Sequence, residues 1–113
     1  MKRGEIYFAD LDPTVGDEIK KIRPVLIISN NANNNFANTI TIIPITSNVN
    51  KVYPFEVLLS MAESGLAKTS KAQCHQIRTI SKKRISNKKI QGLVSNAILA
   101  KIASALKLHL DLI

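Results

Sequence analysis

Arginine and hydroxyl side chains are the groups in this sequence best suited to chemistry, because the other usual catalytic sets are missing. The chain has two histidines, His75 and His109, and one cysteine, Cys74. No acidic pair has metal-ligand spacing, and no glycine-rich phosphate loop or nucleophile-elbow pattern occurs. We expect no metal and no cofactor. We also expect the two histidines to stay apart, because His109 falls near the end of a largely apolar helix; His75 then has a structural or substrate-lining role.

Arginine and threonine are sufficient for one class of reaction, the cleavage of RNA. RNA carries its own nucleophile, the 2′-hydroxyl, so a protein needs only to align it, stabilise charge at phosphorus and assist proton transfer. The arginine fork matches phosphate oxygens, and a threonine hydroxyl donates to a nonbridging oxygen. Such a site needs no metal ion.

The charge of the chain favours a polyanionic partner. The 113 residues include 16 Lys and Arg against 8 Asp and Glu, a formal net charge of +8. No acidic residue lies between Ser64 and Leu110, a window that holds ten of the sixteen cations. This distribution predicts a basic face for RNA, DNA or an acidic protein. For any single lysine of the window, a solvated surface position remains the simpler interpretation.

Length and composition predict one small domain over residues 1–113, a globular chain whose core is built from Ile, Leu and Val. Aromatic residues make up only 4% and Trp is absent. The lone Cys74 excludes an internal disulfide framework. The first residues lack the apolar stretch of a signal peptide and no apolar run is long enough to span a membrane. We therefore expect a cytoplasmic protein with no membrane partner.

Short β-rich runs separated by polar turns predict a mainly β fold, a small and strongly curved sheet or barrel. The expected strands cover residues 4–11, 24–28, 39–46, 55–59, 72–80 and 90–94. Pro44 cannot donate to a ladder, so the third strand should have an edge or a bulge there. Residues 14–22 and the Asn-rich residues 30–38 are expected to be loops, and residues 60–69 a polar connection that turns at Gly65.

A terminal helix is predicted from Ala97 to about Leu110, with Ser95 or Asn96 as its N-cap. Its polar residues form one narrow stripe and the rest of its surface is mainly Ala, Ile and Leu. One apolar face would suffice for packing on the sheet. The second apolar face predicts a further contact, and a second copy of the chain is the simplest candidate. Ser81 is expected to cap a short helical turn over residues 82–84.

An ordered set of motifs along the whole chain resembles a known family. The set comprises Arg3-Gly4-Glu5-Ile6-Tyr7, Ala9-Asp10-Leu11 with Pro13, Gly16 and Glu18, Arg23-Pro24-Val25-Leu26-Ile27-Ile28 with Asn30, Ile45-Thr46, and Gln76-Ile77-Arg78-Thr79-Ile80. The chain resembles the MazF/PemK-type toxins, the ribonucleases of type II toxin–antitoxin pairs. The resemblance implies an SH3-like β-barrel with a C-terminal helix, as in MazF and CcdB, and a homodimer. It implies sequence-specific, metal-independent cleavage of single-stranded RNA, chiefly mRNA, to 2′,3′-cyclic phosphate and 5′-hydroxyl ends. The implied partner is an acidic, MazE-like antitoxin.

The resemblance also assigns roles to residues by motif position. Arg23 becomes the catalytic arginine, active in proton transfer and in stabilising charge on phosphorus, and Thr46 assists at the phosphate. The implied RNA-binding residues are Glu18, Lys20, Lys21, Asn30, Gln76 and Arg78. The sequence departs from the family pattern next to two of the motifs, with Lys21 where relatives commonly have Gly and His75 where they often have Glu.

Two other functions remain open on the sequence alone. A DNA gyrase poison of the same fold, resembling CcdB, would act through its terminal helix and would not need the pair Arg23 and Thr46. A basic RNA-binding module would use the cationic face without catalysis. Taken singly, Arg23, Thr46, Gln76 and Arg78 each fit a structural position at a strand end or on a solvated sheet face.

Overall fold

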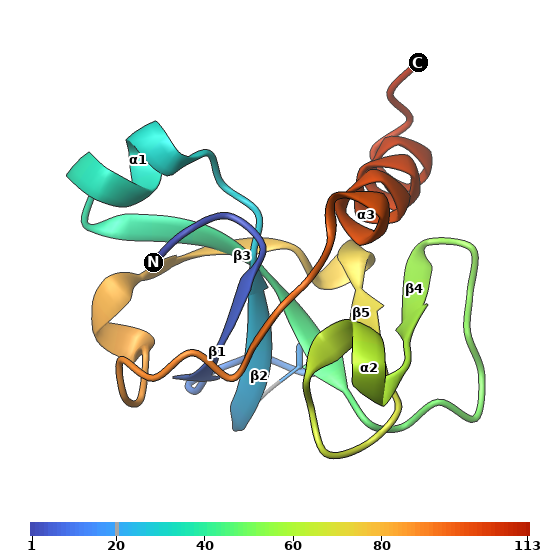
Figure 1. Cartoon of the computed structure of the whole chain (residues 1–113), viewed down its shortest axis with the longest axis horizontal. Coiled ribbons are helices and arrows are strands. Elements are labelled where there is room, and N and C mark those ends of the chain that lie inside the picture. Colours follow the sequence, from blue (N-terminus) through green and yellow to red (C-terminus); the bar gives the residue numbers. More distant parts are fainter. Residues whose placement is uncertain (20) are drawn as a thin grey trace.

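The fold is an antiparallel sheet with a long C-terminal helix (Figure 1), described here from a computed structural model for residues 1–19 and 21–113. Lys20, one of the predicted RNA-binding residues, lies outside the described residues. The elements in chain order are β1 Glu5–Asp10, β2 Ile22–Ile27, α1 Asn31–Phe36, β3 Thr39–Thr46, β4 Glu56–Leu59, α2 Met61–Ser64, β5 Ser70–Gln73, η1 Cys74–Gln76, β6 Arg78–Ser81, η2 Lys82–Arg84, β7 Gly92–Leu93 and α3 Asn96–His109. The strands follow the order β4-β5-β3-β2-β1-β7, with β6 also paired to β3. The predicted mainly β class with a terminal helix is confirmed.

Strand β3 connects the two halves of the sheet. Its first four residues pair with β6, residues 42–44 pair with β2, and Ile45 and Thr46 pair with Ala72 and Lys71 of β5. Between the β5 and β6 ladders, the five residues 73–77 lie opposite only residues 43–44 of β3. Three extra residues are therefore looped out, and they form the 3₁₀ turn η1.

Apolar side chains alternate along these strands and build two cores, one on each face of the curved sheet. Helix α3 covers the first core, to which Ile98, Ile102 and Ala105 contribute. The second core gathers Val25, Ile27 and neighbouring residues of β1, β3 and β6. Aliphatic residues supply nearly all of the buried volume, as the composition predicted. No helix in the described part of the chain is long and apolar enough to cross a membrane.

The predicted strand over 72–80 is wrong, because η1 divides it into β5 and β6. The alternation of faces expected for this segment is lost at the turn. The predicted irregularity at Pro44 is confirmed in the same place, since the looped-out residues lie opposite Ile43 and Pro44. A proline in β3 is tolerated here because the ladder on this side is already interrupted.

Two predicted loops contain short helices. Residues 31–36 of the Asn-rich segment form α1, whose N-cap Asn30 accepts a hydrogen bond from the Asn33 amide. The connection after β4 holds α2, closed by a capping box between Ser60 and Glu63 and ended by Gly65 in the left-handed conformation. Asparagine and serine side chains favour turns and helix starts alike, so their presence alone does not separate the two.

The caps and turns predicted at the other elements are confirmed. Ser95 caps α3 by accepting a hydrogen bond from the Ile98 amide. Ser81 caps η2 by accepting from the Lys83 amide. The last strand is shorter than predicted, with only Gly92 and Leu93 in β7.

Gly92 is required by close packing between β7 and α2. A Cβ at this position would lie 1.8 Å from the Ser64 carbonyl oxygen. We expect Gly92→Ala to lower the free energy of unfolding by about 1–3 kcal/mol in urea denaturation, because backbone must move to admit the methyl group. Gly16→Ala is the control, since the added methyl meets no atom within 4 Å and its positive φ of 58° costs about 1 kcal/mol. Equal stability of wild type and Gly92→Ala would contradict this packing.

Candidate functional site

Arg23 and Thr46 occupy matching positions at the ends of neighbouring strands. The β2–β3 register pairs Ile27 with Ile42 and Val25 with Pro44. Continued by two residues, the same register sets Arg23 opposite Thr46. Alternation also places both residues on the face of the sheet that carries the second core, together with Arg78 of β6. The side chains of Arg23, Thr46 and Arg78 thus follow the buried apolar side chains along their strands on this face of the sheet.

The hydroxyl of Thr46 is held in place and keeps its proton for another acceptor. The side chain is 8% exposed, and its Oγ1 accepts a hydrogen bond from the Asn48 amide at 3.2 Å. Because Oγ1 accepts in that contact, the hydroxyl hydrogen stays available to a ligand oxygen.

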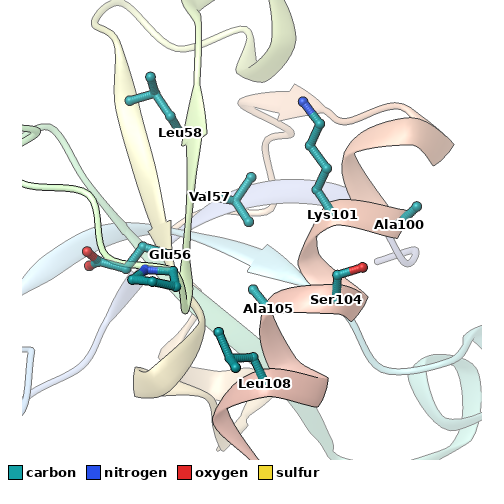
Figure 2. A pocket seen from close by; sticks show the side chains of 9 residues that line it. Glu56, Val57, Leu58, Ala100, Lys101, Ser104, Ala105 and Leu108 are labelled. Carbon is teal, nitrogen blue, oxygen red and sulfur yellow. The ribbon is translucent and has the colours of Figure 1, made fainter. Parts of the chain in front are cut away.

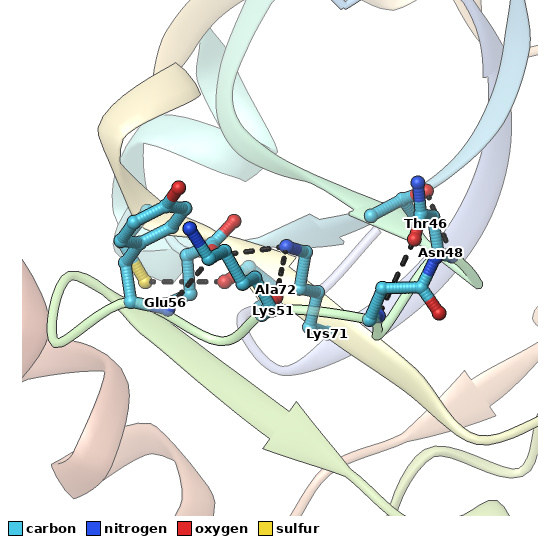
Figure 3. Close-up of polar contacts among 9 residues, drawn as sticks. Thr46, Asn48, Lys51, Glu56, Lys71 and Ala72 are labelled. Carbon is cyan, nitrogen blue, oxygen red and sulfur yellow. Dashed lines mark hydrogen bonds and ion pairs between the residues drawn. The ribbon is translucent and has the colours of Figure 1, made fainter.

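A buried ion pair between Lys71 of β5 and Glu56 of β4 lies beside Thr46 (Figure 3). Lys71, the β5 partner of Thr46, donates from Nζ to Glu56 Oε1 at 3.0 Å and to the Lys51 carbonyl oxygen at 2.6 Å. The same Glu56 oxygen accepts from the Tyr53 amide at 3.0 Å. These hydrogen bonds offset part of the cost of burying the two charged groups. The pair fixes the β3–β4 connection against β5.

Arg23 lines a cavity of about 260 Å³ at the same end of the sheet. Its lining is mostly apolar, from Phe8, Ile22, Pro24, Ile45, Leu66 and Ala67, and it also includes Ser47, Lys68 and Ser70 but not Thr46. Among the lining residues, two cations and two hydroxyls can donate to the anionic oxygens of a phosphate group.

The loop between β1 and β2 is fastened over this face by predicted site residues. Gln76 Oε1 accepts from the Ile19 amide at 3.4 Å, and Arg78 donates to the Leu11 carbonyl oxygen at 3.3 Å. Glu18 is exposed and accepts from the Val15 amide at 2.7 Å within the loop. These contacts bring Glu18, Gln76 and Arg78 into one neighbourhood.

Lys21 closes the base of the same loop, where its carbonyl oxygen accepts from the Leu11 amide at 3.1 Å. Its φ of 71° lies in the left-handed region, which a glycine adopts without steric cost. The backbone shape at this position explains why a glycine suits it, and the lysine adds an exposed positive charge there instead.

Asn30 lies apart from the other predicted residues. It follows the far end of β2 from Arg23 and caps α1. A polar hollow there is lined by Asn30, Arg3, Asn33 and Thr41. The Arg3 guanidinium donates to the Ile28 carbonyl oxygen and its amide donates to Asn31 Oδ1, so this hollow is fixed by the N-terminal segment.

The expectation that the two histidines stay apart is wrong. The ring centroids of His75 and His109 are 6.2 Å apart. The centroid of the Phe55 ring lies 4.5 Å from that of His75 and 6.2 Å from that of His109. His109 is the last residue of α3 and is exposed. Its place at the end of the helix brings its ring close to His75 of η1. Among the described residues no group of three or more His, Cys, Asp or Glu side chains could hold a metal ion.

Burial lowers the pKa of His75 below its usual value, and the neighbouring His109 and Lys71 lower it further, against an opposing effect of Glu56. Its Nδ1 is buried without a hydrogen-bond partner among the described groups. The imidazole is therefore neutral at pH 7 and costly to charge.

Another cavity, of about 580 Å³, lies between β4 and α3 (Figure 2). Val57 of β4 points toward α3, where Ala105, Leu108 and Lys101 also line the cavity, whereas Leu58 points to the other side of the strand. Its lining is mainly apolar, with Glu56, Lys101 and Ser104 as the polar residues. Lys101 and Ser104 belong to the predicted polar stripe of the helix, so the second apolar face expected for α3 stays a prediction.

Comparison with known proteins identifies the family. A family described as "PemK-like, MazF-like toxin of type II toxin-antitoxin system" matches residues 2–110. The chain belongs to this family. Its full-length match to the family agrees with the motif series that runs from Arg3 to Ile80 and with the observed fold.

Curated relatives share much of the sequence. The chain is 48% identical to "Endoribonuclease MazF9" of Mycobacterium tuberculosis, over 99% of this chain and 98% of that protein. It is 37% identical to "Endoribonuclease EndoA" of Bacillus subtilis, over 100% of this chain and 97% of that protein.

Solved structures share the fold. A mycobacterial endoribonuclease in complex with its cognate antitoxin superposes with a TM-score of 0.81 at 26% identity, over 100% of this chain and 97% of that one. MazF from Deinococcus radiodurans gives a TM-score of 0.84 at 22% identity, over 98% and 96% of the two chains.

Sequence reasoning missed three features near the site. These are the Lys71–Glu56 ion pair, the stacked rings of Tyr53 and Phe55, and the approach of His75 to His109. An acidic residue directly before the apolar run of β4 was a signal for the first. The histidine contact had none, because it depends on where α3 ends relative to η1.

The low pKa of His75 predicts a pH dependence of stability. Between about pH 7 and pH 5 the unfolded chain binds more protons than the folded chain, so the free energy of unfolding should fall as the pH falls. His75→Gln should reduce that fall in urea titrations at the two pH values. An NMR titration of the His75 ring checks the cause directly. A pKa at or above about 6.5 for this ring, or an unchanged slope in the variant, would contradict the assignment.

Proposed function

We propose that this toxin is an endoribonuclease that cleaves single-stranded RNA, chiefly mRNA, at specific sequences through Arg23 and Thr46. The proposal is supported by the β2–β3 register, which sets the two residues opposite one another when it is extended two residues beyond the paired Val25 and Pro44, and by a cavity that Arg23 and Lys68 line. Curated relatives at 48% and 37% identity over nearly the whole chain carry the name endoribonuclease.

The chemistry follows from the donors at this strand end. The RNA 2′-hydroxyl gives its proton to solvent and attacks the adjacent phosphorus, the bond to the 5′ oxygen breaks, and a 2′,3′-cyclic phosphate and a 5′-hydroxyl result. Arg23 donates hydrogen bonds to the nonbridging oxygens as negative charge builds up, passes a proton to the departing 5′ oxygen and regains one from solvent. Thr46 donates a hydrogen bond from its hydroxyl to the same phosphoryl group. Electrostatic stabilisation of this kind needs no metal ion.

The neighbouring residues form the path of the RNA strand. Gln76 and Arg78 lie beneath the β1–β2 loop that carries Glu18 and Lys21, and the net charge of +8 attracts the phosphate backbone. We assign Lys20 to the same loop from its place in the sequence. Asn30 would contact a more distant part of the strand, because it lies at the other end of β2.

Two protein partners complete the proposal. The first is an acidic antitoxin of the MazE kind, supported by the net charge and by the antitoxin complex of the similar mycobacterial structure. The second is another copy of the chain. The groove between β4 and α3 and the exposed Leu58, Leu108 and Leu110 provide apolar surface for such a homodimer. RNA as substrate and an antitoxin as inhibitor both require action in the cytoplasm.

The nuclease accounts for the site better than the two alternatives. A gyrase poison or a passive RNA-binding module would give no reason for an arginine and a threonine at matched positions beside a small cationic cavity. The relatives' names also support cleavage over either alternative.

Substitution at the two residues tests the proposal. The protein is incubated with a long RNA in EDTA and the 5′ ends are mapped by primer extension. Arg23→Ala should cut at the same positions at least about 10²–10³-fold more slowly, since it removes the charged donor to the phosphoryl group. Thr46→Val, which keeps the size of the side chain, should have a smaller effect.

Lys89→Ala is the matched control, because it removes one exposed cation that is not among the residues assigned to the site. It should cut like the wild type apart from a modest loss of affinity. Equal rates for wild type and Arg23→Ala would overturn the catalytic assignment. Intact RNA together with trapped gyrase–DNA complexes would support the gyrase poison.

A further inference from the structure

A cluster of aromatic rings lies on the surface next to the proposed site. The rings of Tyr53 and Phe55 are parallel within 4°, with centroids 5.3 Å apart. Phe55 meets His75 edge-on at 4.5 Å, and His109 lies 6.2 Å from both. The residues come from the β3–β4 connection, η1 and the end of α3. We refer to Tyr53, Phe55, His75 and His109 as the aromatic platform.

The gathering of these rings is notable for so aliphatic a chain. The sequence has two Tyr, three Phe, two His and no Trp, and four of these seven rings are in the platform. The core does not need them, since Ile, Leu and Val fill it. Tyr53 is 45% exposed. An aromatic ring kept in solvent and buttressed by a second ring is a preformed surface for stacking.

Positive charge lies over the exposed ring. The Lys51 and Lys71 ammonium nitrogens lie over Tyr53, 5.7 Å and 6.0 Å from the ring centroid. Lys51 is exposed, whereas Lys71 is held by Glu56. An exposed ring with a solvent-exposed cation near its face matches one unpaired nucleotide, whose base stacks and whose phosphate is anionic.

The platform is connected to Thr46 through Lys71. Thr46 and Lys71 are direct partners in the β3–β5 ladder, and residues paired in this way have Cβ atoms about 5 Å apart. Figure 3 shows Lys71 lying between Thr46 on one side and Lys51 and Glu56 on the other. His75 of the platform directly precedes Gln76 in η1, so the platform also adjoins the proposed RNA path at Gln76.

We infer that the aromatic platform is a stacking subsite for one unpaired base of the RNA, next to the nucleotide whose phosphate meets Thr46. This inference rests on the proposed function and adds a residue, Tyr53, that positions the substrate strand. Stacking is tolerant of base identity, so the platform contributes affinity and register and leaves most sequence discrimination to other contacts.

A fluorescent base tests the platform. The RNA carries the mapped cut site with a 2′-deoxynucleotide in place of the attacking one, so that it binds without being cut. 2-Aminopurine, whose fluorescence falls on stacking, is placed at one position at a time on either side. Wild type should quench one position adjacent to the cut. Tyr53→Leu should lose that quenching and bind about 5- to 150-fold more weakly, and Tyr53→Phe should retain both.

Phe36→Leu is the matched control, because it removes an 88%-exposed ring at the end of α1, on the other side of the molecule from β4 (Figure 1). It should leave quenching and affinity unchanged. Thermal melting shows whether each variant is folded, and Tyr53→Phe keeps the ring if Tyr53→Leu does not fold.

The outcomes separate this inference from the proposed function. If wild type cuts RNA but no position near the cut is quenched, or Tyr53→Leu binds as wild type does, the platform is not an RNA subsite. If Tyr53→Leu weakens only the binding of the antitoxin, the surface belongs to that protein partner and the inference is overturned. If wild type cuts no RNA, the proposed function fails. Quenching of a mixed-sequence single strand containing 2-aminopurine then still decides the platform.

Discussion

The register between β2 and β3 is the constraint on which the site depends. β3 is hydrogen-bonded to β6, β2 and β5 in turn, so a shift of one residue would break three ladders and turn every β3 side chain to the opposite face. Buried Val25 and Ile27 on β2 and Ile40 and Ile42 on β3 hold this register from the second core. The same apolar packing that stabilises the fold therefore also sets the positions of Arg23 and Thr46 at the strand ends.

The three residues that loop out in η1 bring side chains to the proposed site. They allow β5 and β6 to follow one another along β3 while Cys74, His75 and Gln76 leave the ladder. Gln76 then reaches the β1–β2 loop, and His75 reaches Phe55 and the end of α3. An interruption of pairing beside Pro44, which costs ladder hydrogen bonds, thus places side chains from distant parts of the chain around one strand end.

Much of the fold could be predicted from the sequence, because local patterns determine it. The β-branched run 39–46, the Ser95 cap and the turn after Ser81 are set by residues within a few positions. The division of 72–80 depends on a partner strand thirty residues earlier, and no local pattern reveals it. The contact of His75 with His109 likewise depends on tertiary packing. Of the predicted site, the motif residues could be named, whereas the separate position of Asn30 and the buried Lys71–Glu56 pair required the structure.

If Arg23 and Thr46 act on one phosphoryl group, as proposed, their contributions to the cleavage rate must be coupled, and a double-mutant cycle measures that coupling. Single-turnover rates are measured for wild type, Arg23→Ala, Thr46→Val and the double variant on one RNA in EDTA. Groups that serve the same transition state are not additive. We predict that the double variant is slower than Arg23→Ala by clearly less than the factor that Thr46→Val alone produces. Fully multiplicative losses, or a wild-type rate for Thr46→Val, would contradict the account.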